Sequence, residues 1–113
     1  MSKKKLLVID DEKDFCLLLK KFFAKKGFDI HISHYLQEGM KMLEALKPDI
    51  LILDNNLPDG LGWKKAEFIY EKFPKLKLIL ISAYHPDNSL AIKYPSIKIY
   101  EKPIDLVELN NHL

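Results

Sequence analysis

Short apolar runs alternate along this chain with longer stretches in which apolar residues recur every three or four positions. An unbroken apolar run bounded by turn residues is typical of a strand buried on both faces, and the longer spacing is that of an amphipathic helix. The runs predict five strands, at residues 5–9, 28–33, 49–53, 77–81 and 97–100.

A helix is predicted after each of these strands. The helices cover residues 13–26, 36–46 and 63–73, then a short segment capped by Asp87, Asn88 or Ser89, and a last segment that begins at Asp105. Gly27 and Pro48 mark the ends of the first two helices, and Pro95 limits the fourth. Five strand–helix repeats predict an α/β fold, a parallel sheet with helices on both faces and right-handed connections.

Residues 50–60 are the stretch around which this pattern is organised. An apolar run ends at Asp54, and Asn55, Pro58 and Gly60 are typical turn residues. We therefore expect Asp54 at the carboxyl end of a central strand, the edge at which open α/β sheets bind ligands. For an isolated Asp, a hydrogen bond to the following turn would be the simpler interpretation.

Polar residues end four of the predicted strands: Asp10-Asp11, Asp54, Ser82 and Lys102. In a parallel sheet these ends share one edge, where three carboxylates repel one another unless a hard cation, Mg²⁺ or Mn²⁺, lies between them. An ionised Asp54 beside such an ion is a nucleophile for a phosphoryl group. The metal, the lysine and the hydroxyl would stabilise the charge on the phosphoryl oxygens.

Four motifs in this order resemble the receiver domain of two-component response regulators. They are Val8-Ile9-Asp10-Asp11-Glu12, Leu53 to Gly60, Ile81-Ser82-Ala83 and Glu101-Lys102-Pro103. The resemblance implies a flavodoxin-like (βα)5 fold with strand order 2-1-3-4-5. It further implies a single receiver domain over residues 1–113, with no output domain in this chain.

The same resemblance assigns roles to the acidic residues. Asp54 matches the phosphoacceptor, Asp11 the direct metal ligand, and Asp10 the acid that reaches the metal through water. The backbone carbonyl of Asn56 is expected to complete the metal site.

The other matched positions concern the phosphoryl group and the switch. Lys102 matches the phosphate-binding lysine and Ser82 the switch hydroxyl, and the Lys102-Pro103 bond is expected to be cis. The family usually has an aromatic residue three positions before the lysine, where this chain has Ile99. Tyr100 should face the opposite side of the strand. We therefore expect Ile99 to contribute little to the conformational switch. Tyr84 is expected to be the aromatic ring that moves on phosphorylation.

Composition narrows the possible partners and location. The net charge is +2, all 18 basic residues are lysine, and no apolar run is long enough to span a membrane. The lack of arginine argues against nucleic-acid binding by this chain. The single Cys16 fits a reducing, cytoplasmic compartment. The expected partner is a sensor histidine kinase or a histidine phosphotransfer protein, with an unknown output partner and oligomeric state.

Three other functions fit parts of the pattern. A haloacid dehalogenase-type phosphatase also uses a strand-end Asp, but it needs a second Asp where this chain has Asn56. A flavin or nucleotide module would need a glycine-rich loop after the first strand. A receiver-like scaffold that never takes phosphate would not need the full set of polar residues. The prediction is a signalling domain rather than an enzyme that turns over a separate substrate.

The remaining residues have structural interpretations. His31 and His34 have no acidic or cysteine partners at metal-binding spacing and are expected to be surface or strand residues, and His85 is expected to be a loop residue. Trp63 is expected in the core, and Cys16 is expected to pack as a small hydrophobic residue.

Overall fold

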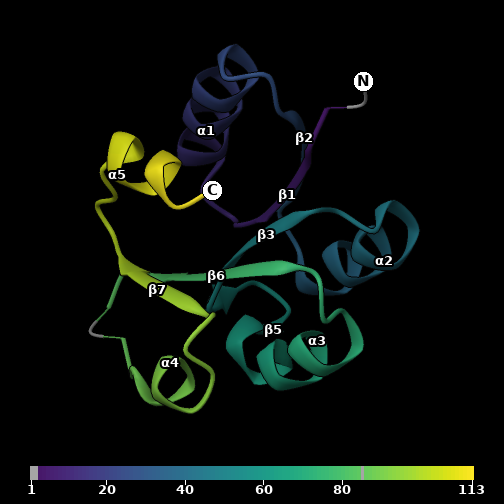
Figure 1. The fold of residues 1–113 in the computed structure, drawn as a ribbon, viewed down its shortest axis with the longest axis vertical. Coiled ribbons are helices and arrows are strands. Elements are labelled where there is room, and N and C mark those ends of the chain that lie inside the picture. The colour runs from purple at the N-terminus through teal and green to yellow at the C-terminus, as the bar shows by residue number, and fades with distance from the viewer. Residues whose placement is uncertain (1–2, 85) are drawn as a thin grey trace.

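A five-stranded parallel sheet forms the centre of the computed structural model, which describes residues 3–84 and 86–113 (Figure 1). The strands, in their order across the sheet, are β2 (Asp29–Ser33), β1 (Lys5–Ile9), β3 (Ile50–Asp54), β6 (Lys77–Ser82) and β7 (Lys98–Glu101). All four pairings are parallel. This is the predicted flavodoxin-like order 2-1-3-4-5.

Helices cover both faces of this sheet (Figure 1). They are α1 (Lys13–Lys25), α2 (Leu36–Leu46), the 3-10 turn η1 (Gly62–Lys65), α3 (Ala66–Lys72), α4 (Ser89–Lys93) and α5 (Leu106–Asn111). Helices α1 and α5 pack on one face, and α2, α3 and α4 on the other. None of the helices in the described part of the chain is long and apolar enough to cross a membrane.

Strand β1 shows how the sequence divides the core between the two faces. Leu6 and Val8 face the cluster beneath α1 and α5, whereas Leu7 and Ile9 face the cluster beneath α2 and α3. All four side chains are fully buried. Burial of each contributes about 2 kcal/mol, so both helical layers hold the strand that leads into the acidic motif.

Two glycines let helical segments approach the strand ends closely. A Cβ at Gly39 in α2 would lie 2.5 Å from Cδ1 of Ile9, and a Cβ at Gly62 would lie 2.2 Å from the carbonyl oxygen of Asp54. The second contact is with backbone and has no flexible side chain to yield. Any larger residue at position 62 would therefore displace the end of β3.

The element boundaries agree with the sequence analysis to within about one residue, except after Asp54. The expected turn contains a short antiparallel hairpin, formed by β4 (Asn56–Leu57) and β5 (Gly60–Leu61). The expected helix at 63–73 begins as the 3-10 turn η1. Two-residue strands and a tight first turn leave no periodic pattern, so hydrophobic spacing alone does not reveal them. The last helix is predicted to begin at Asp105, and Asp105 is its N-cap: its side chain accepts hydrogen bonds from the N–H groups of Val107 and Glu108.

Candidate functional site

Carboxylates from two strand ends meet at the carboxyl edge of the sheet. Asp10 follows β1 and is fully buried, Asp54 ends β3 and is 4% exposed, and Asp11 is exposed beside them. One ligand oxygen from each lies within 4.8 Å of the other two. The sequence pattern predicted this juxtaposition, because parallel strands end on the same side of the sheet.

The protein environment opposes ionisation of the two buried carboxyl groups. Burial, with the charge of Asp10 as the second cause, raises the pKa of Asp54 to about 7. Burial also raises the pKa of Asp10, although Lys102 and the backbone N–H of Glu12 act in the opposite direction. The site therefore concentrates more negative charge than the protein neutralises by itself.

This donor set fits a hard divalent cation. Two of the acids, Asp10 and Asp54, are buried, and the third, Asp11, is exposed to solvent. Mg²⁺ prefers such oxygen ligands and keeps several of its waters. Asp10 is fixed in place because its Oδ1 accepts a 2.8 Å hydrogen bond from the backbone N–H of Glu12. Asn56 begins β4 two residues after Asp54, with an exposed side chain. Its carbonyl as a metal ligand stays a prediction.

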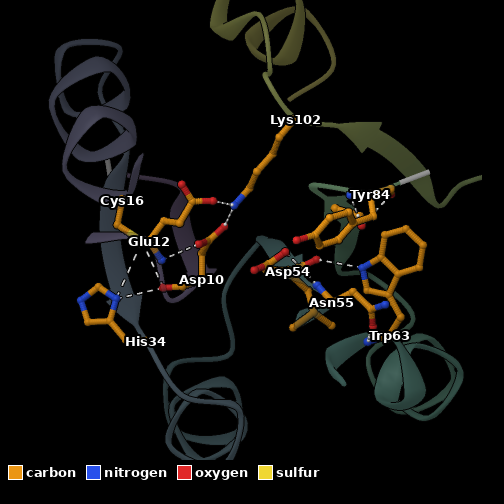
Figure 2. Close-up of polar contacts among 11 residues, drawn as sticks. Asp10, Glu12, Cys16, His34, Asp54, Asn55, Trp63, Tyr84 and Lys102 are labelled. Atoms are coloured by element: carbon orange, nitrogen blue, oxygen red, sulfur yellow. Dashed lines mark hydrogen bonds and ion pairs between the residues drawn. The ribbon is translucent and has the colours of Figure 1, made fainter. Parts of the chain in front are cut away.

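Lys102 approaches the acids from the end of β7 (Figure 2). Its Nζ lies 2.8 Å from Oδ2 of Asp10 and 2.6 Å from Oε1 of Glu12. Within the described residues, it forms no ion pair with Asp54. The Lys102-Pro103 peptide bond is cis.

Ser82, at the end of β6, is 4% exposed and bonds to the loop that follows it. Its Oγ donates to the carbonyl of Tyr84 at 2.9 Å and accepts from the N–H of Tyr84 at 3.2 Å. The Tyr84 residue is 74% exposed. Ile99 packs against the core cluster on the face covered by α2, α3 and α4, whereas Tyr100 packs against the cluster on the opposite face, which confirms their predicted orientations.

Asn55 is a site residue that the sequence analysis described only as a turn former. Its N–H donates to Oδ1 of Asp54 at 3.0 Å, and its side-chain oxygen accepts from the N–H of Trp63 at 3.2 Å. The half-buried Trp63 donates its indole N–H to the carbonyl of Leu53 at 3.2 Å. These bonds tie η1 to the residues on either side of Asp54.

Asp59 is a second residue whose role the sequence analysis missed. Its two carboxylate oxygens accept from the N–H groups of Leu36, at 2.7 Å, and Gln37, at 2.9 Å. These hydrogen bonds lower the pKa of Asp59. It thus caps α2 from the loop after Asp54, a partnership 23 residues apart that no local capping pattern reveals.

His31 lies in β2, a strand residue as expected, and neither His31 nor His34 belongs to the group of possible metal ligands found in the described part of the chain. Both histidines nevertheless have polar neighbours. Nδ1 of His34 lies 2.9 Å from the carbonyl oxygen of Asp10 and 4.0 Å from Sγ of Cys16, and His31 lies 3.2 Å from Asp29. The strand register brings these residues together, and spacing along the chain does not show it. His85 lies outside the described residues.

Cys16 is buried, as predicted, and its thiol donates to the carbonyl of Asp10 at 3.3 Å. Burial raises the pKa of this thiol to about 12. Cys16 is therefore an unreactive packing residue beneath the acidic site.

A parallel sheet with carboxylates, a hydroxyl and a lysine along one edge defines a signalling domain of the receiver type. Over residues 6–113 the chain matches the family described as response regulator receiver domain. Because the match covers nearly the whole chain, the protein belongs to that family. It is a phosphoacceptor signalling domain of a two-component system, and the phosphatase and nucleotide-module interpretations no longer apply.

Known relatives agree with this assignment. The response regulator protein PilR of Pseudomonas aeruginosa is 30% identical over 111 residues, which cover 96% of this chain and 25% of PilR. The photosynthetic apparatus regulatory protein RegA of Rhodobacter capsulatus is 25% identical over 114 residues, or 99% of this chain and 62% of RegA. The chain thus spans only part of the length of these two relatives.

The fold matches solved structures as well. The crystal structure of a two-component response regulator from Clostridium difficile has a TM-score of 0.84 and 27% identity to this chain. The similarity covers 96% of this chain and 91% of that one.

Proposed function

We propose that Asp54 accepts a phosphoryl group from a phosphohistidine of a partner kinase or phosphotransfer protein. The observation that carries this proposal is the position of Asp54, a buried carboxylate within 4.8 Å of the other two acids at the ligand-binding edge. A carboxylate oxygen of Asp54 attacks phosphorus, and the bond from phosphorus to the histidine nitrogen breaks. That nitrogen keeps the electron pair and then takes up a proton.

Asp10, Asp11 and Asp54, with the backbone carbonyl of Asn56, would hold Mg²⁺, or Mn²⁺ in its place. The ion, when bound, supplies positive charge that favours the ionised form of Asp54 and stabilises the phosphoryl oxygens. Asp11 is expected to be the direct ligand because it is exposed at the rim. Asp10 is expected to act through water, because its two oxygens already bind Glu12 and Lys102.

Lys102 and Ser82 would bind the phosphoryl oxygens once Asp54 is modified. For Ser82 this requires giving up its hydrogen bonds to Tyr84, so the loop that carries Tyr84 must rearrange. The domain thereby changes its surface in response to phosphorylation without turning over a separate substrate. The exposed Tyr84 ring would also shield the aspartyl phosphate from water.

Intact mass after incubation with a small phosphodonor tests the proposal. The wild type should gain one phosphoryl group with Mg²⁺ and none with a chelator, and Asp54→Ala should gain none. Asp49→Ala is a matched control, because Asp49 lies just before the other end of β3 and bonds to the N–H of Lys5. An adduct on Asp54→Ala, or none on the wild type with several donors, would contradict the proposal.

A further inference from the structure

The ammonium group of Lys102 rests against the start of α1 (Figure 2). Besides Asp10, it contacts Oε1 of Glu12 at 2.6 Å and lies 4.7 Å from the centre of the Phe15 ring. The Lys102 side chain is 11% exposed, so these groups replace most of its water. Glu12 and Phe15 lie outside the set of residues that the proposed phosphoryl transfer uses.

Glu12 is free to bind the lysine because it does not cap its own helix. It occupies the N-cap position of α1, yet its side chain makes no capping hydrogen bond. Its carboxylate instead contacts a lysine 90 residues further along the chain. An ion pair with one half-exposed partner holds the ammonium group only modestly, because water screens the attraction.

Phe15 supplies the second contact. Its ring is partly buried against the core cluster beneath α1 and α5, which fixes the position of the ring. A cation close to an aromatic ring, within roughly 6 Å of its centre, is attracted by the ring quadrupole. The carboxylate and the ring therefore hold the same ammonium group from the α1 side.

We propose that Glu12 and Phe15 form a resting seat for Lys102, which the lysine leaves when Asp54 carries a phosphoryl group. The proposal rests on the proposed function, since it concerns the lysine expected to bind that group. Glu12 and Phe15 are positioning residues. They stabilise the unphosphorylated arrangement, so the contacts given up on leaving the seat slow phosphorylation and shorten the life of the modified state.

The resting position has a spectroscopic signature. A methylene group next to the Phe15 ring experiences its ring current, so the Cε protons of Lys102 should resonate upfield of those of ordinary lysines. Phe15→Leu should abolish this shift, and Glu12→Gln should reduce it, while Glu12→Asp should restore part of it. Lys102→Ala identifies the signal.

Two control variants match these changes elsewhere on α1. Asp14→Asn removes one charge from an exposed residue in the first turn of the helix. Phe22→Leu removes a ring that lies 5.5 Å from a different ammonium group, that of Lys26. Both controls should leave the Lys102 signal unchanged.

The same signal reports departure from the seat. Beryllofluoride with Mg²⁺ imitates a phosphoryl group on Asp54, and its addition should move the Lys102 signal to the position seen in Phe15→Leu. Phosphorylation by a small donor should be about five-fold faster in Glu12→Gln and about two-fold faster in Phe15→Leu, and unchanged in both controls.

An ordinary Lys102 shift in the wild type, or a shift unaffected by Phe15→Leu and Glu12→Gln, would overturn the resting seat. Slower phosphorylation of Glu12→Gln than of Asp14→Asn would overturn its inhibitory effect. A wild type that takes up neither beryllofluoride nor phosphoryl would refute the proposed function and the departure of the lysine. The upfield shift would still report whether the seat exists.

Discussion

Ser33 ends strand β2 and Ser82 ends strand β6, and each hydroxyl bonds to the backbone two residues further on. Oγ of Ser33 lies 2.9 Å from the carbonyl of Tyr35, and it also lies 2.9 Å from Oε1 of Glu38 in α2. Within the described residues, Ser82 has the backbone contacts to Tyr84 but no bond to another side chain. The turn after Ser33 is thus bonded to helix α2, whereas the described contacts of Ser82 do not bond the equivalent turn to a helix.

The helices that follow the two serines also differ in length and in the number of buried residues. After Ser33 comes α2, with 11 residues, three of them buried, and a cap supplied by Asp59. After Ser82 comes α4, with five residues and none of them buried. A short helix with few buried contacts opens at low free-energy cost. We infer that the half of the sheet near β2 keeps its structure when Asp54 is phosphorylated, whereas the half near β7 rearranges.

The largest expected effect belongs to β3, which joins the two halves. Burial raises the pKa of Asp54 from 3.8 to about 7, so between these values the folded protein holds a proton that the unfolded chain has lost. The free energy of unfolding therefore falls as pH rises through this window. Without Mg²⁺, Asp54→Asn should stabilise the protein by on the order of 3 kcal/mol at pH 8.

This gain should disappear below pH 4, where the wild-type carboxyl is protonated in the unfolded chain as well as in the folded protein. Denaturant unfolding at both pH values, in the presence of a chelator, measures it. Asp49→Asn, before the opposite end of the strand, should show no such gain. A pH-independent effect of Asp54→Asn would mean that the charge of Asp54 is not what opposes folding.

The two serines give the next largest effect. Ser33→Ala should lower the free energy of unfolding by about 2 kcal/mol, because it removes a hydrogen bond to the charged carboxylate of Glu38 as well as the bond to the Tyr35 carbonyl. Ser82→Ala should cost about 1 kcal/mol or less, because the exposed loop can turn its polar groups to water. Urea unfolding of the two variants is the measurement, and equal losses would remove the distinction between the halves.

Removing the side chains that cap α2 and α4 should give a smaller difference in the free energy of unfolding. Asp59→Ala removes two hydrogen bonds from the start of α2 and should cost about 1 kcal/mol. Asp87 accepts one hydrogen bond, at 2.9 Å from the N–H of Ser89, so Asp87→Ala should cost about half as much. Thermal unfolding followed by circular dichroism would resolve the two. A larger loss at Asp87 would show that α4 is more firmly fixed than its burial indicates.

The smallest effects on the free energy of unfolding are expected at Tyr84 and Ile99, whose substitutions test the conformational switch instead. Tyr84→Ala should shorten the lifetime of the aspartyl phosphate, because the exposed ring is proposed to shield it. Ile99→Ala should leave the lifetime nearly unchanged, because Ile99 packs within the α3 side of the core and has no polar tip to exchange with water. Loss of phosphoryl over time, followed by mass spectrometry, compares them. The opposite order would assign the switch to Ile99.

The sequence predicts the parallel sheet and the meeting of the three acids, because strand periodicity and strand ends are local properties that a parallel sheet brings to one edge. The order of the strands follows only from the resemblance to receiver domains. It does not predict the cap that Asp59 gives to α2 or the bonds between Asn55 and Trp63. Both depend on how the loop after Asp54 folds back on its neighbours. Nor does it show that Lys102 lies on Glu12, since the partners of a long side chain are decided by packing.

Backbone amide NMR of the wild type with and without beryllofluoride and Mg²⁺ shows directly which half of the sheet responds when Asp54 is modified. We expect large shifts around Asp54, at residues 82–84 and along α4 and β7, with small shifts at Ser33 and along α2. Asp54→Ala should show none of them. Shifts along α2 as large as those near Ser82 would contradict the distinction between the two halves of the sheet, and shifts that persist in Asp54→Ala would show that they do not arise from modification of Asp54.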